Sequence, residues 1–430
     1  MRNARRVLIA VVVAGVAGAL ATSGLSAGAA APSEDGVTKD AIKIGYIYSK
    51  TGVAGSTFQN ADKGCKARID RENAAGGVNG RKVDVTNVDD QSSANLTAAQ
   101  DLVQNKHVFT LVNNSPLAFL TYRWLLDHNV PYVSGGYDGT YYGTKGNENI
   151  VSALGNVFPQ NGVTTDGLAK LFKAMGAKRV AAIAYGVSAS STAAAQSLLN
   201  FAIPGVGLKK GYLNTTVDFG STDVGPLVLG IKNDGADGVY LPLVANSNIA
   251  VAQGLAQNGV KMKSIVMATG YGQPLLDQPA SKEFGSNIVM AQGWAPVELK
   301  TKATKRFQAD LKKYTGYTGV PDFGIYTGYI DCDLMLLGLE AAGKNPTRQS
   351  FIDGLHNVGK FNPGGGLGCA DVDISLEHYG TASPTSCSWY MQVKNGKFTL
   401  FKQKNGDSIW RGKLIGATTQ ATTTTTAPPA

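Results

Sequence analysis

Residue types that perform catalysis or hold metals are few in this chain, and their spacing suits neither task. The four histidines lie far apart, at His107, His128, His356 and His378. They form no HExxH or other metal-ligand spacing, and neither a GxSxG nucleophile motif nor a P-loop is present. Asp89 and Asp90 are a carboxylate pair, but adjacent strand residues face opposite ways, which favours loop or capping roles. The sequence therefore predicts no catalytic residue, metal site, cofactor or enzyme activity.

Polar and aromatic residues instead gather where predicted strands end. Apolar runs predict strands over residues 108–112 and 130–134, and a polar loop follows each of them. In open parallel sheets, ligands lie outside the carboxyl ends of the strands, so we expect both loops to face one crevice. Nearby tyrosines, among them Tyr141 and Tyr142, favour a crevice that is both polar and aromatic. The candidate ligand-binding residues are Asn114, Ser115, Gly136, Tyr137, Asp138, Tyr185 and Tyr271.

The stretch from Ile42 to Asp90 predicts the elements that position these loops. Residues 42–48 form an apolar run typical of a buried strand, and a helix-like segment follows it. Gly76 and Gly77 end that helix, and residues 82–88 alternate like a second strand. Strand, helix and strand in this order form a βαβ unit with parallel strands.

The same alternation of strands and helices is predicted in the second part of the chain. Strands are predicted over residues 180–184, 209–217, 238–241 and 264–267, and helices over residues 161–175, 190–201, 223–232, 300–314 and 323–342. The sequence thus predicts an α/β fold of two doubly wound lobes, each built on a parallel central sheet. Near the C-terminus, alternating residues on both sides of Asn395-Gly396 predict a β-hairpin.

Size and charge exclude some functions. The chain has 430 residues, of which 43% are hydrophobic, enough to bury a sizeable core. Its formal net charge is +9; Arg2, Arg5 and Arg6 contribute three of these charges, which leaves 9 − 3 = +6 for the rest. No cluster of lysine and arginine is interleaved with aromatic residues, which favours a solvated basic surface. We expect no nucleic-acid partner.

Residues 1–29 have the three parts of a secretory signal peptide. After the charged start, Val7–Leu20 is apolar but shorter than the about 20 residues that span a membrane, and Ala27-Gly28-Ala29 offers a cleavage site. This predicts an extracytoplasmic location: secreted, periplasmic or at the cell surface. No cysteine precedes Cys65, so no lipoprotein anchor is predicted at the cleavage point. Residues 412–430, rich in Thr, Ala and Pro, are predicted to be disordered.

Four cysteines in an exported chain indicate two disulfides, for which three connectivities are possible. We favour Cys369–Cys387, which would join the ends of an insertion near the C-terminus. Cys65–Cys332 would then join two helices. The alternative is that Cys65 and Cys332 are small buried hydrophobic residues.

One run of residues carries a family resemblance. Residues 73–82, with the sequence NAAGGVNGRK, followed by Asp89-Asp90, resemble the first-lobe signature of the leucine/isoleucine/valine-binding proteins. These are type I extracytoplasmic solute-binding proteins of ATP-driven importers, and the resemblance extends over roughly residues 42–403. It implies two lobes joined by a multi-strand hinge. Lobe I would comprise residues 40–155 plus 293–360, and lobe II residues 156–292 plus 369–411.

The resemblance also implies roles for single residues. Ser115 aligns with the family's serine that bonds the ligand carboxylate, and Gly136 with a residue whose backbone serves the same group. Two positions depart from the family: Asp138 stands where a threonine bonds that carboxylate, and Gly270, beside Tyr271, where an acidic residue receives the ligand ammonium. The positions that bind the carboxylate and the ammonium of an α-amino acid in the family thus both differ in this chain. Asp138 could instead receive an ammonium, an amide or a hydroxyl.

The function expected from this resemblance is that of a non-enzymatic solute-binding protein. It would capture a small polar solute, such as an amino acid or amide, between two lobes and deliver it to the permease of an ABC importer. We expect it to act as a monomer. Two alternatives remain open from the sequence: a sensor that passes its closed state to a receptor, and a secreted α/β enzyme.

Overall fold

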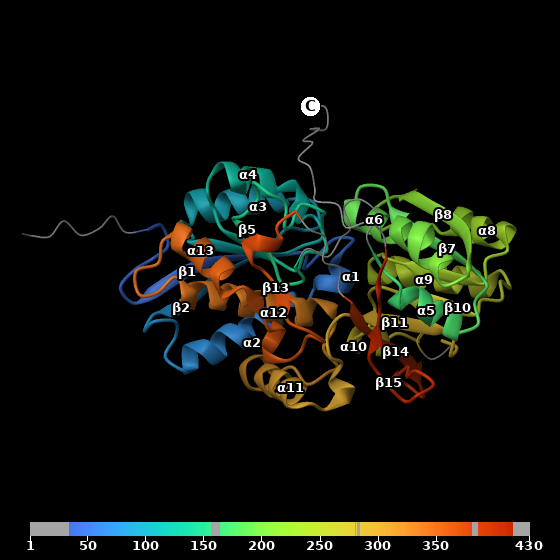
Figure 1. The fold of residues 1–430 in the computed structure, drawn as a ribbon. Helices are drawn as coiled ribbons and strands as arrows, with labels where there is room; N and C mark the ends of the chain where they lie inside the picture. Colours follow the sequence, from blue (N-terminus) through green and yellow to red (C-terminus); the bar gives the residue numbers. More distant parts are fainter. Residues whose placement is uncertain (1–33, 156–163, 280, 282–283, 381–385, 416–430) are drawn as a thin grey trace, which may run out of the picture. The chain divides into compact units, whose positions relative to one another are not determined.

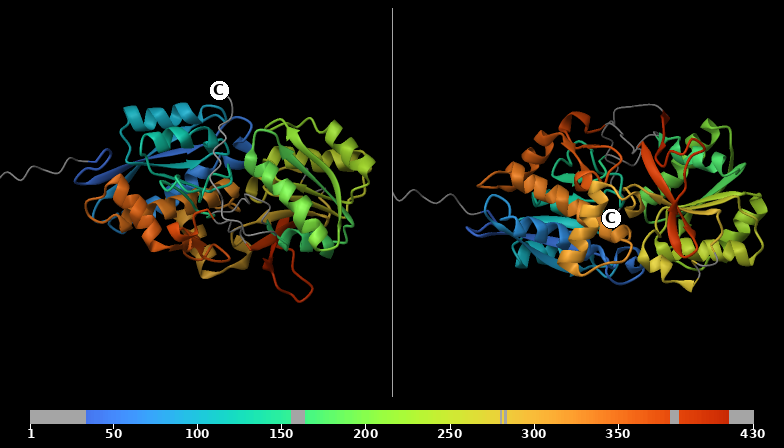
Figure 2. Two further views of the ribbon diagram at one scale, coloured as in Figure 1. Left: turned by 45° about the horizontal axis from the view of Figure 1, so that its top comes forward. Right: turned by 90° about the horizontal axis from the view of Figure 1, so that it is seen from below.

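A computed structural model describes residues 34–155, 164–279, 281, 284–380 and 386–415. Part of the sequence expectations falls outside these ranges: the signal peptide over residues 1–29, the start of the helix over residues 161–175, and most of the tail over residues 412–430. From Glu34 onward the chain forms one compact unit. It contains two large sheets, which lie side by side in Figure 1 and in both views of Figure 2.

The first sheet has five parallel strands in the order β2-β1-β3-β4-β5. Their bounds are β1 (Ala41–Tyr48), β2 (Lys82–Asp89), β3 (Thr110–Asn114), β4 (Tyr132–Ser134) and β5 (Ile150–Ser152). The βαβ unit predicted from the sequence is confirmed, because β1 and β2 pair in parallel over their full lengths on either side of a helix.

Helices cover both faces of the first sheet (Figure 1). They are α2 (Ala61–Ala74), α12 (Phe323–Ala341) and α13 (Arg348–Val358) on one face, and α3 (Asn95–Gln100) and α4 (Tyr122–Asp127) on the other. Alternate residues of each strand supply the two cores: Val112 of β3 packs on the side of α12, and Leu111 on the side of α4. Both side chains are fully buried.

Two glycines let α2 and α12 approach each other closely. A Cβ atom on Gly64 would lie 2.0 Å from the carbonyl oxygen of Ile325, and one on Gly328 would lie 2.1 Å from that of Ala61. No side chain fits at either distance, so each glycine is required by the contact between the helices and not by its own backbone conformation.

Replacing Gly64 by Ala is therefore expected to lower the free energy of unfolding by about 1–3 kcal/mol, the usual cost of overpacking. Urea unfolding would measure the loss. The matched control is Gly225→Ala at the exposed start of a helix, where the nearest atom to a new Cβ lies 3.9 Å away. If Gly64→Ala were as stable as the control variant, the close approach of the two helices would be wrong.

The second sheet is mixed. Its main path runs β15-β14-β11-β10-β9-β7-β8, with β7 to β11 parallel and β14 and β15 antiparallel at one edge. The bounds are β7 (Arg179–Tyr185), β8 (Lys209–Val217), β9 (Gly238–Leu241), β10 (Ser264–Met267), β11 (Ile288–Gln292), β14 (Cys387–Lys394) and β15 (Lys397–Leu400). The predicted hairpin is confirmed, since β14 and β15 pair around Asn395 and Gly396, both with positive φ.

This sheet is also covered on both faces. One face carries α5 (Gly167–Ala174) and α6 (Ala189–Ser197), and the other α8 (Gly225–Asp234) and α9 (Ala245–Gln257). Helix α11 (Lys302–Thr315) packs against α2 of the first sheet. The shorter elements are α1 (Gly55–Phe58), α7 (Ile203–Gly205), α10 (Gln273–Leu276), β6 (Thr164–Thr165), β12 (Lys360–Phe361), β13 (Val372–Asp373), β16 (Trp410–Arg411) and β17 (Leu414–Ile415).

Several predicted boundaries were wrong, and β5, β11 and α13 were not predicted. Asn113 and Asn114 were expected in a loop but end β3. Their side chains are fully buried and bonded within the first lobe, for instance Asn113 Nδ2 to Asn95 Oδ1 at 2.8 Å. A strand can run on through buried asparagines when such partners exist, and the partners are distant in sequence.

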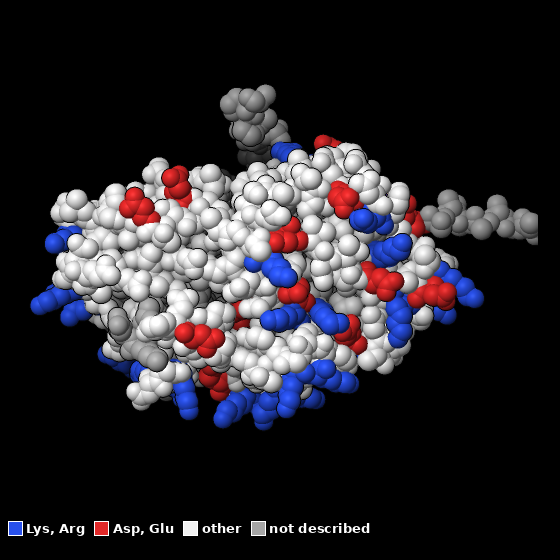
Figure 3. Space-filling model, turned by 180° about the vertical axis from the view of Figure 1, so that it is seen from behind, with Lys and Arg blue, Asp and Glu red and all other residues white. Residues whose placement is uncertain are grey.

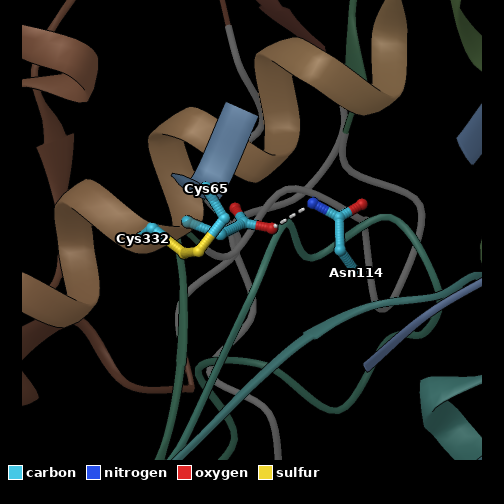
Figure 4. The surroundings of a disulfide bond; sticks show 4 residues. Cys65, Asn114 and Cys332 are labelled. Carbon is cyan, nitrogen blue, oxygen red and sulfur yellow. Dashed lines mark hydrogen bonds between the residues drawn. A yellow bond between two sulfur atoms is a disulfide. The ribbon is translucent and has the colours of Figure 1, made fainter. Parts of the chain in front are cut away.

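Both favoured disulfides are present. Cys65–Cys332 joins α2 to α12 across a sequence separation of 267 residues, beside Asn114 at the end of β3 (Figure 4). Cys369–Cys387 closes a separation of 18 residues. Among the described cysteines none is free, so the alternative of two small buried hydrophobic residues was wrong.

The basic charge of the chain lies on its surface. Lysine and arginine side chains gather along the lower edge in Figure 3, the edge at which Figure 1 places α11. This helix exposes Lys302, Lys305, Lys312 and Lys313, whereas its acidic residue, Asp310, is buried and paired with Arg71 at 2.7 Å. In the part of the chain that the structure describes, no helix has the length and apolar character needed to cross a membrane.

Candidate functional site

A cavity opens where the strands of both sheets end. Its empty space is about 1010 Å³, part of which is open solvent. Residues that follow β3, β4 and β5 line it on one side, and residues at the ends of β7 to β11 line it on the other. This is the position at which parallel α/β sheets bind ligands, because loops from several strands converge there.

Three aromatic residues form the wall on the side of the first sheet. The ring of Tyr137 lies 5.4 Å from the rings of both Phe58, which ends α1, and Phe323, which begins α12. Phe58 and Phe323 meet edge to face at 5.7 Å. The three rings support one another and present a continuous aromatic surface to the cavity.

Serines form part of the opposite wall, at the start of α6. Ser188 caps the helix and accepts a hydrogen bond from Ser191 N at 3.2 Å. Ser190 Oγ donates to the carbonyl oxygen of Tyr137 at 2.6 Å, which joins the two walls directly. Three hydroxyls and the first N–H groups of a helix at one place suit an oxygen-bearing group on a ligand, neutral or anionic.

Two tyrosines of the second sheet also line the cavity. Tyr185 at the end of β7 is fixed: its hydroxyl donates to Ser247 Oγ at 2.8 Å and accepts from Val244 N at 3.1 Å. Burial raises the pKa of Tyr240 on β9 to about 12. The Tyr240 hydroxyl has no hydrogen-bond partner among the described residues, so it is available to a ligand.

Gly293, just after β11, opens directly on the cavity. A Cβ atom built on it meets no other atom within 4 Å, and its φ is not in the positive range. Neither backbone conformation nor close packing requires glycine here. The missing side chain leaves room beside Trp294, which also lines the cavity.

The described part of the cavity wall carries no formal charge. None of the described residues that line it is Asp, Glu, Lys, Arg or His. Seven of them are aromatic: Phe58, Tyr137, Tyr185, Phe219, Tyr240, Trp294 and Phe323. A ligand ammonium would find no carboxylate on this wall, and an unpaired buried charge is costly.

Of the candidate residues predicted from the sequence, Tyr137 and Tyr185 line this cavity. Ser115 does not: its hydroxyl is fully buried, donates to Asp90 Oδ2 at 2.5 Å and accepts from Leu117 N at 3.1 Å. Asp90 also accepts from Ser49 Oγ at 2.7 Å, whereas Asp89, the other member of the acidic pair, ends β2. Pro116, the residue after Ser115, lines the cavity instead.

Asp138 is enclosed by tyrosines. The hydroxyls of Tyr141 and Tyr142 donate to its carboxylate, the latter at 2.8 Å. Burial raises the pKa of Asp138 to about 6. None of these three residues lines the cavity, and Gly136 packs tightly against Ser152, since a Cβ there would lie 2.0 Å from Ser152 Oγ.

Tyr271 lies at a second, smaller cavity with about 310 Å³ of empty space, together with Gly270. Its hydroxyl donates to Glu298 Oε2 at 2.7 Å. Asn114 lies behind the main cavity, where it accepts a hydrogen bond from the Tyr137 hydroxyl at 2.5 Å. The tyrosines at the strand ends were therefore the sequence feature that pointed to the cavity. The sequence analysis did not single out the serines of α6, Tyr240 or Gly293 as cavity residues.

One cluster outside the cavity combines serine, histidine and aspartate. His378 Nδ1 lies 2.9 Å from Asp373 Oδ2 and 3.2 Å from Ser375 Oγ. A hydrolytic triad needs the serine and the aspartate on different ring nitrogens, so this arrangement is not a nucleophile relay. Within the described ranges, no group of three or more His, Cys, Asp or Glu is placed to hold a metal ion.

Comparisons with known proteins agree with this architecture. A family model described as periplasmic binding protein matches residues 41–397. The Leu/Ile/Val-binding protein homolog 7 of Brucella abortus is 27% identical over 346 residues, which cover 75% of this chain and 81% of that protein.

Solved structures with the same fold include three ABC transporter proteins. The substrate-binding protein LivJ of Streptococcus pneumoniae, in complex with isoleucine, has a TM-score of 0.66 at 18% identity and covers 84% of this chain and 99% of its own. A solute-binding protein of R. palustris in complex with 4-hydroxybenzoate has a TM-score of 0.68 at 21% identity, and the match covers 87% of this chain and 98% of that protein's chain. A fatty acid substrate-binding protein of Thermomonospora curvata has a TM-score of 0.67 at 17% identity, with 86% and 94% covered.

Proposed function

This chain belongs to the periplasmic binding protein family, and from that premise we propose that it captures a small solute in the cavity between its two sheets. The family is extracytoplasmic and binds solutes without transforming them. We propose that the signal peptide over residues 1–29 directs export, and that the loaded protein delivers its solute, as a monomer, to the permease of an ABC importer.

Contacts across the cavity support a closing motion. Besides the bond from Ser190 to Tyr137, Ala245 N at the start of α9 donates to Thr57 Oγ1 of α1 at 2.9 Å. A few polar bonds at the rim, and a cavity behind them, are what two lobes that hinge around a ligand require. The ligand would bind the closed state better than the open one and so shift the population toward closure.

Our proposal for the class of ligand rests on the uncharged, aromatic wall of the cavity. We propose a solute with an aromatic ring and a single oxygen-bearing head group, such as a carboxylate or hydroxyl, and without an ammonium group. The ring would lie among Tyr137, Phe323 and Trp294, and the head group would meet the serines of α6. The relative in complex with 4-hydroxybenzoate fits this class better than the one in complex with isoleucine does.

A matched pair of ligands tests this class. We expect 3-phenylpropanoate to bind, and phenylalanine, which has the same skeleton plus an ammonium group, to bind at least roughly a hundredfold more weakly because that charge stays unpaired. Titration calorimetry, with the fluorescence of Trp294 as a second signal, would measure both. If phenylalanine or isoleucine bound as tightly as the acid, the proposed class would be wrong.

The serines of α6 are tested by Ser190→Ala. Losing this hydroxyl removes the bond to Tyr137 that joins the two walls around the ligand, so we expect about tenfold weaker binding of 3-phenylpropanoate. Ser197→Ala at the other end of α6 is the control, because Ser197 does not line the cavity. Equal affinity of both variants would remove the serines from the site.

A further inference from the structure

A chain of hydrogen bonds leads from the cavity wall into the core of the first lobe. The Tyr137 hydroxyl donates to Asn114 Oδ1 at 2.5 Å, and Asn114 Nδ2 donates to Asp331 Oδ2 at 3.1 Å. Thr327 Oγ1, one turn before Asp331 on α12, also donates to Asn114 Oδ1 at 3.0 Å. Figure 4 shows Asn114 and its bond toward α12, next to the Cys65–Cys332 disulfide. In this arrangement the amide oxygen of Asn114 accepts two hydrogen bonds and its nitrogen donates one.

Asp331, at the inner end, is unusual for a carboxyl group. It is fully buried, and its second oxygen, Oδ1, has no hydrogen-bond partner among the described residues. The titratable groups that act on it or face it are Tyr46 of β1 and Tyr137 and Asp138 of the loop after β4. Of these, Asp138 is a second carboxyl group.

No basic group on the other described elements packed against α12 is bonded to Asp331. On α2, Arg68 bonds to Asp333 at 2.5 Å, Arg71 to Asp310 at 2.7 Å and Lys66 to Asp70 at 2.6 Å, and Lys63 donates to Asn60 Oδ1 at 2.8 Å. On α13, the ring nitrogens of buried His356 contact the backbone carbonyl oxygens of Ile374 and Glu148. Segment α1 has the sequence GSTF and carries no titratable group.

An ionised Asp331 would thus be a buried charge with one hydrogen bond and no counter-ion, which is costly. Burial, and then the nearby Asp138, raise the pKa of Asp331 well above its ordinary value. The protonated acid avoids this cost. The buried hydroxyl of Tyr46, on which Asp331 acts electrostatically, also has no hydrogen-bond partner among the described residues.

We propose that Asp331 is a positioning residue of the ligand cavity that acts as a neutral carboxylic acid, holding Asn114 and through it the ring of Tyr137. The neutral acid offers Oδ2 as a simple acceptor and keeps negative charge away from the site. The inference rests on the proposed function, because the position of Tyr137 matters to binding only if the cavity takes the ligand.

The test compares Asp331→Asn, which keeps the shape and the neutral state, with Asp331→Leu, which removes the acceptor. We expect Asp331→Asn to bind 3-phenylpropanoate within about threefold of the unmodified protein at pH 6, and Asp331→Leu at least about tenfold more weakly. Tyr137→Phe should weaken binding as well, and the double variant Tyr137→Phe/Asp331→Leu should lose less than the sum, because both act on one chain of bonds. Additive losses, or equal losses in the Asn and Leu variants, would overturn the proposal.

A second readout needs no ligand. Because the raised pKa favours the protonated folded protein, the contribution of Asp331 to stability is present at acid pH and is lost as pH rises. In urea unfolding, the stability of Asp331→Asn relative to the unmodified protein should therefore increase from pH 5 to pH 8. Asp333→Asn on the same helix, which breaks the pair with Arg68, should lose stability at pH 7.

These two readouts separate the failures. Suppose that none of the variants bound the ligand, and that Asp331→Asn still gained stability relative to the unmodified protein as pH rose. The proposed function would then be wrong, whereas the inference of a neutral Asp331 would hold. A constant or falling difference with pH would show an ionised Asp331 and overturn the inference, whatever the ligand does.

Discussion

Replacing Gly293 by Phe is expected to abolish ligand binding and leave the fold intact. A side chain at this position enters open space, since no atom lies within 4 Å of its Cβ, and the space that it enters is the cavity. A phenyl ring there would occupy the room that we assign to the ligand ring. We expect affinity for 3-phenylpropanoate to fall roughly a hundredfold or more, which corresponds to about 2.8 kcal/mol.

Two variants make this result specific. Gly293→Ala adds only a methyl group and should change affinity less than about threefold, whereas Gly225→Phe places the same ring on the exposed start of α8 and should change nothing. Calorimetry would give the affinities, and thermal unfolding would show that all three variants fold. Unchanged affinity of folded Gly293→Phe would place the binding site elsewhere.

Removing the Cys65–Cys332 disulfide is expected to cost more stability than any other single change considered. It closes a sequence separation of 267 residues, and the chain-entropy estimate for a loop of that size is about 5.6 kcal/mol. The bond is also fully buried between α2 and α12, next to Asp331. Loosening α12 should therefore weaken ligand binding too, through Asn114 and Tyr137.

The second disulfide provides the comparison. Cys369–Cys387 closes a separation of only 18 residues, for which the same estimate is about 3 kcal/mol. Urea unfolding of Cys65→Ala/Cys332→Ala and of Cys369→Ala/Cys387→Ala under identical conditions would rank them. An equal or larger loss in the second variant would contradict the assignment of the long disulfide as the main covalent support of the first lobe.

Much of the second sheet could be predicted because strands such as β9 and β10 are short apolar runs between polar loops. Strands β8, β9 and β10 lie where the sequence placed them. Strand β11 was missed, although its sequence IVMAQ is largely apolar and Gly293 follows it directly. Between β3 and β4, a short 3-10 turn at Ala118–Leu120 precedes α4.

The site was predicted in part for the same reason. Tyr137 and Tyr185 were found because each comes at or just after the end of a strand, where local pattern points to a ligand. Ser115 and Asp138 also follow strand ends. Their side chains are nevertheless buried, because Ser115 bonds to Asp90 and Asp138 accepts from Tyr141 and Tyr142. Strand position alone does not tell whether a polar side chain faces the cavity or a buried partner.

By itself the sequence determined the α/β class and the family resemblance, since each depends on local periodicity or on a short run of residues. It favoured, among three connectivities, the two disulfides that the structure contains. Only the tertiary structure decided which residues share the cavity. Ser190 meets Tyr137 and Gly293 opens beside them because two sheets, far apart in sequence, face each other at their strand ends. That contact depends on long-range packing, and no local pattern encodes it.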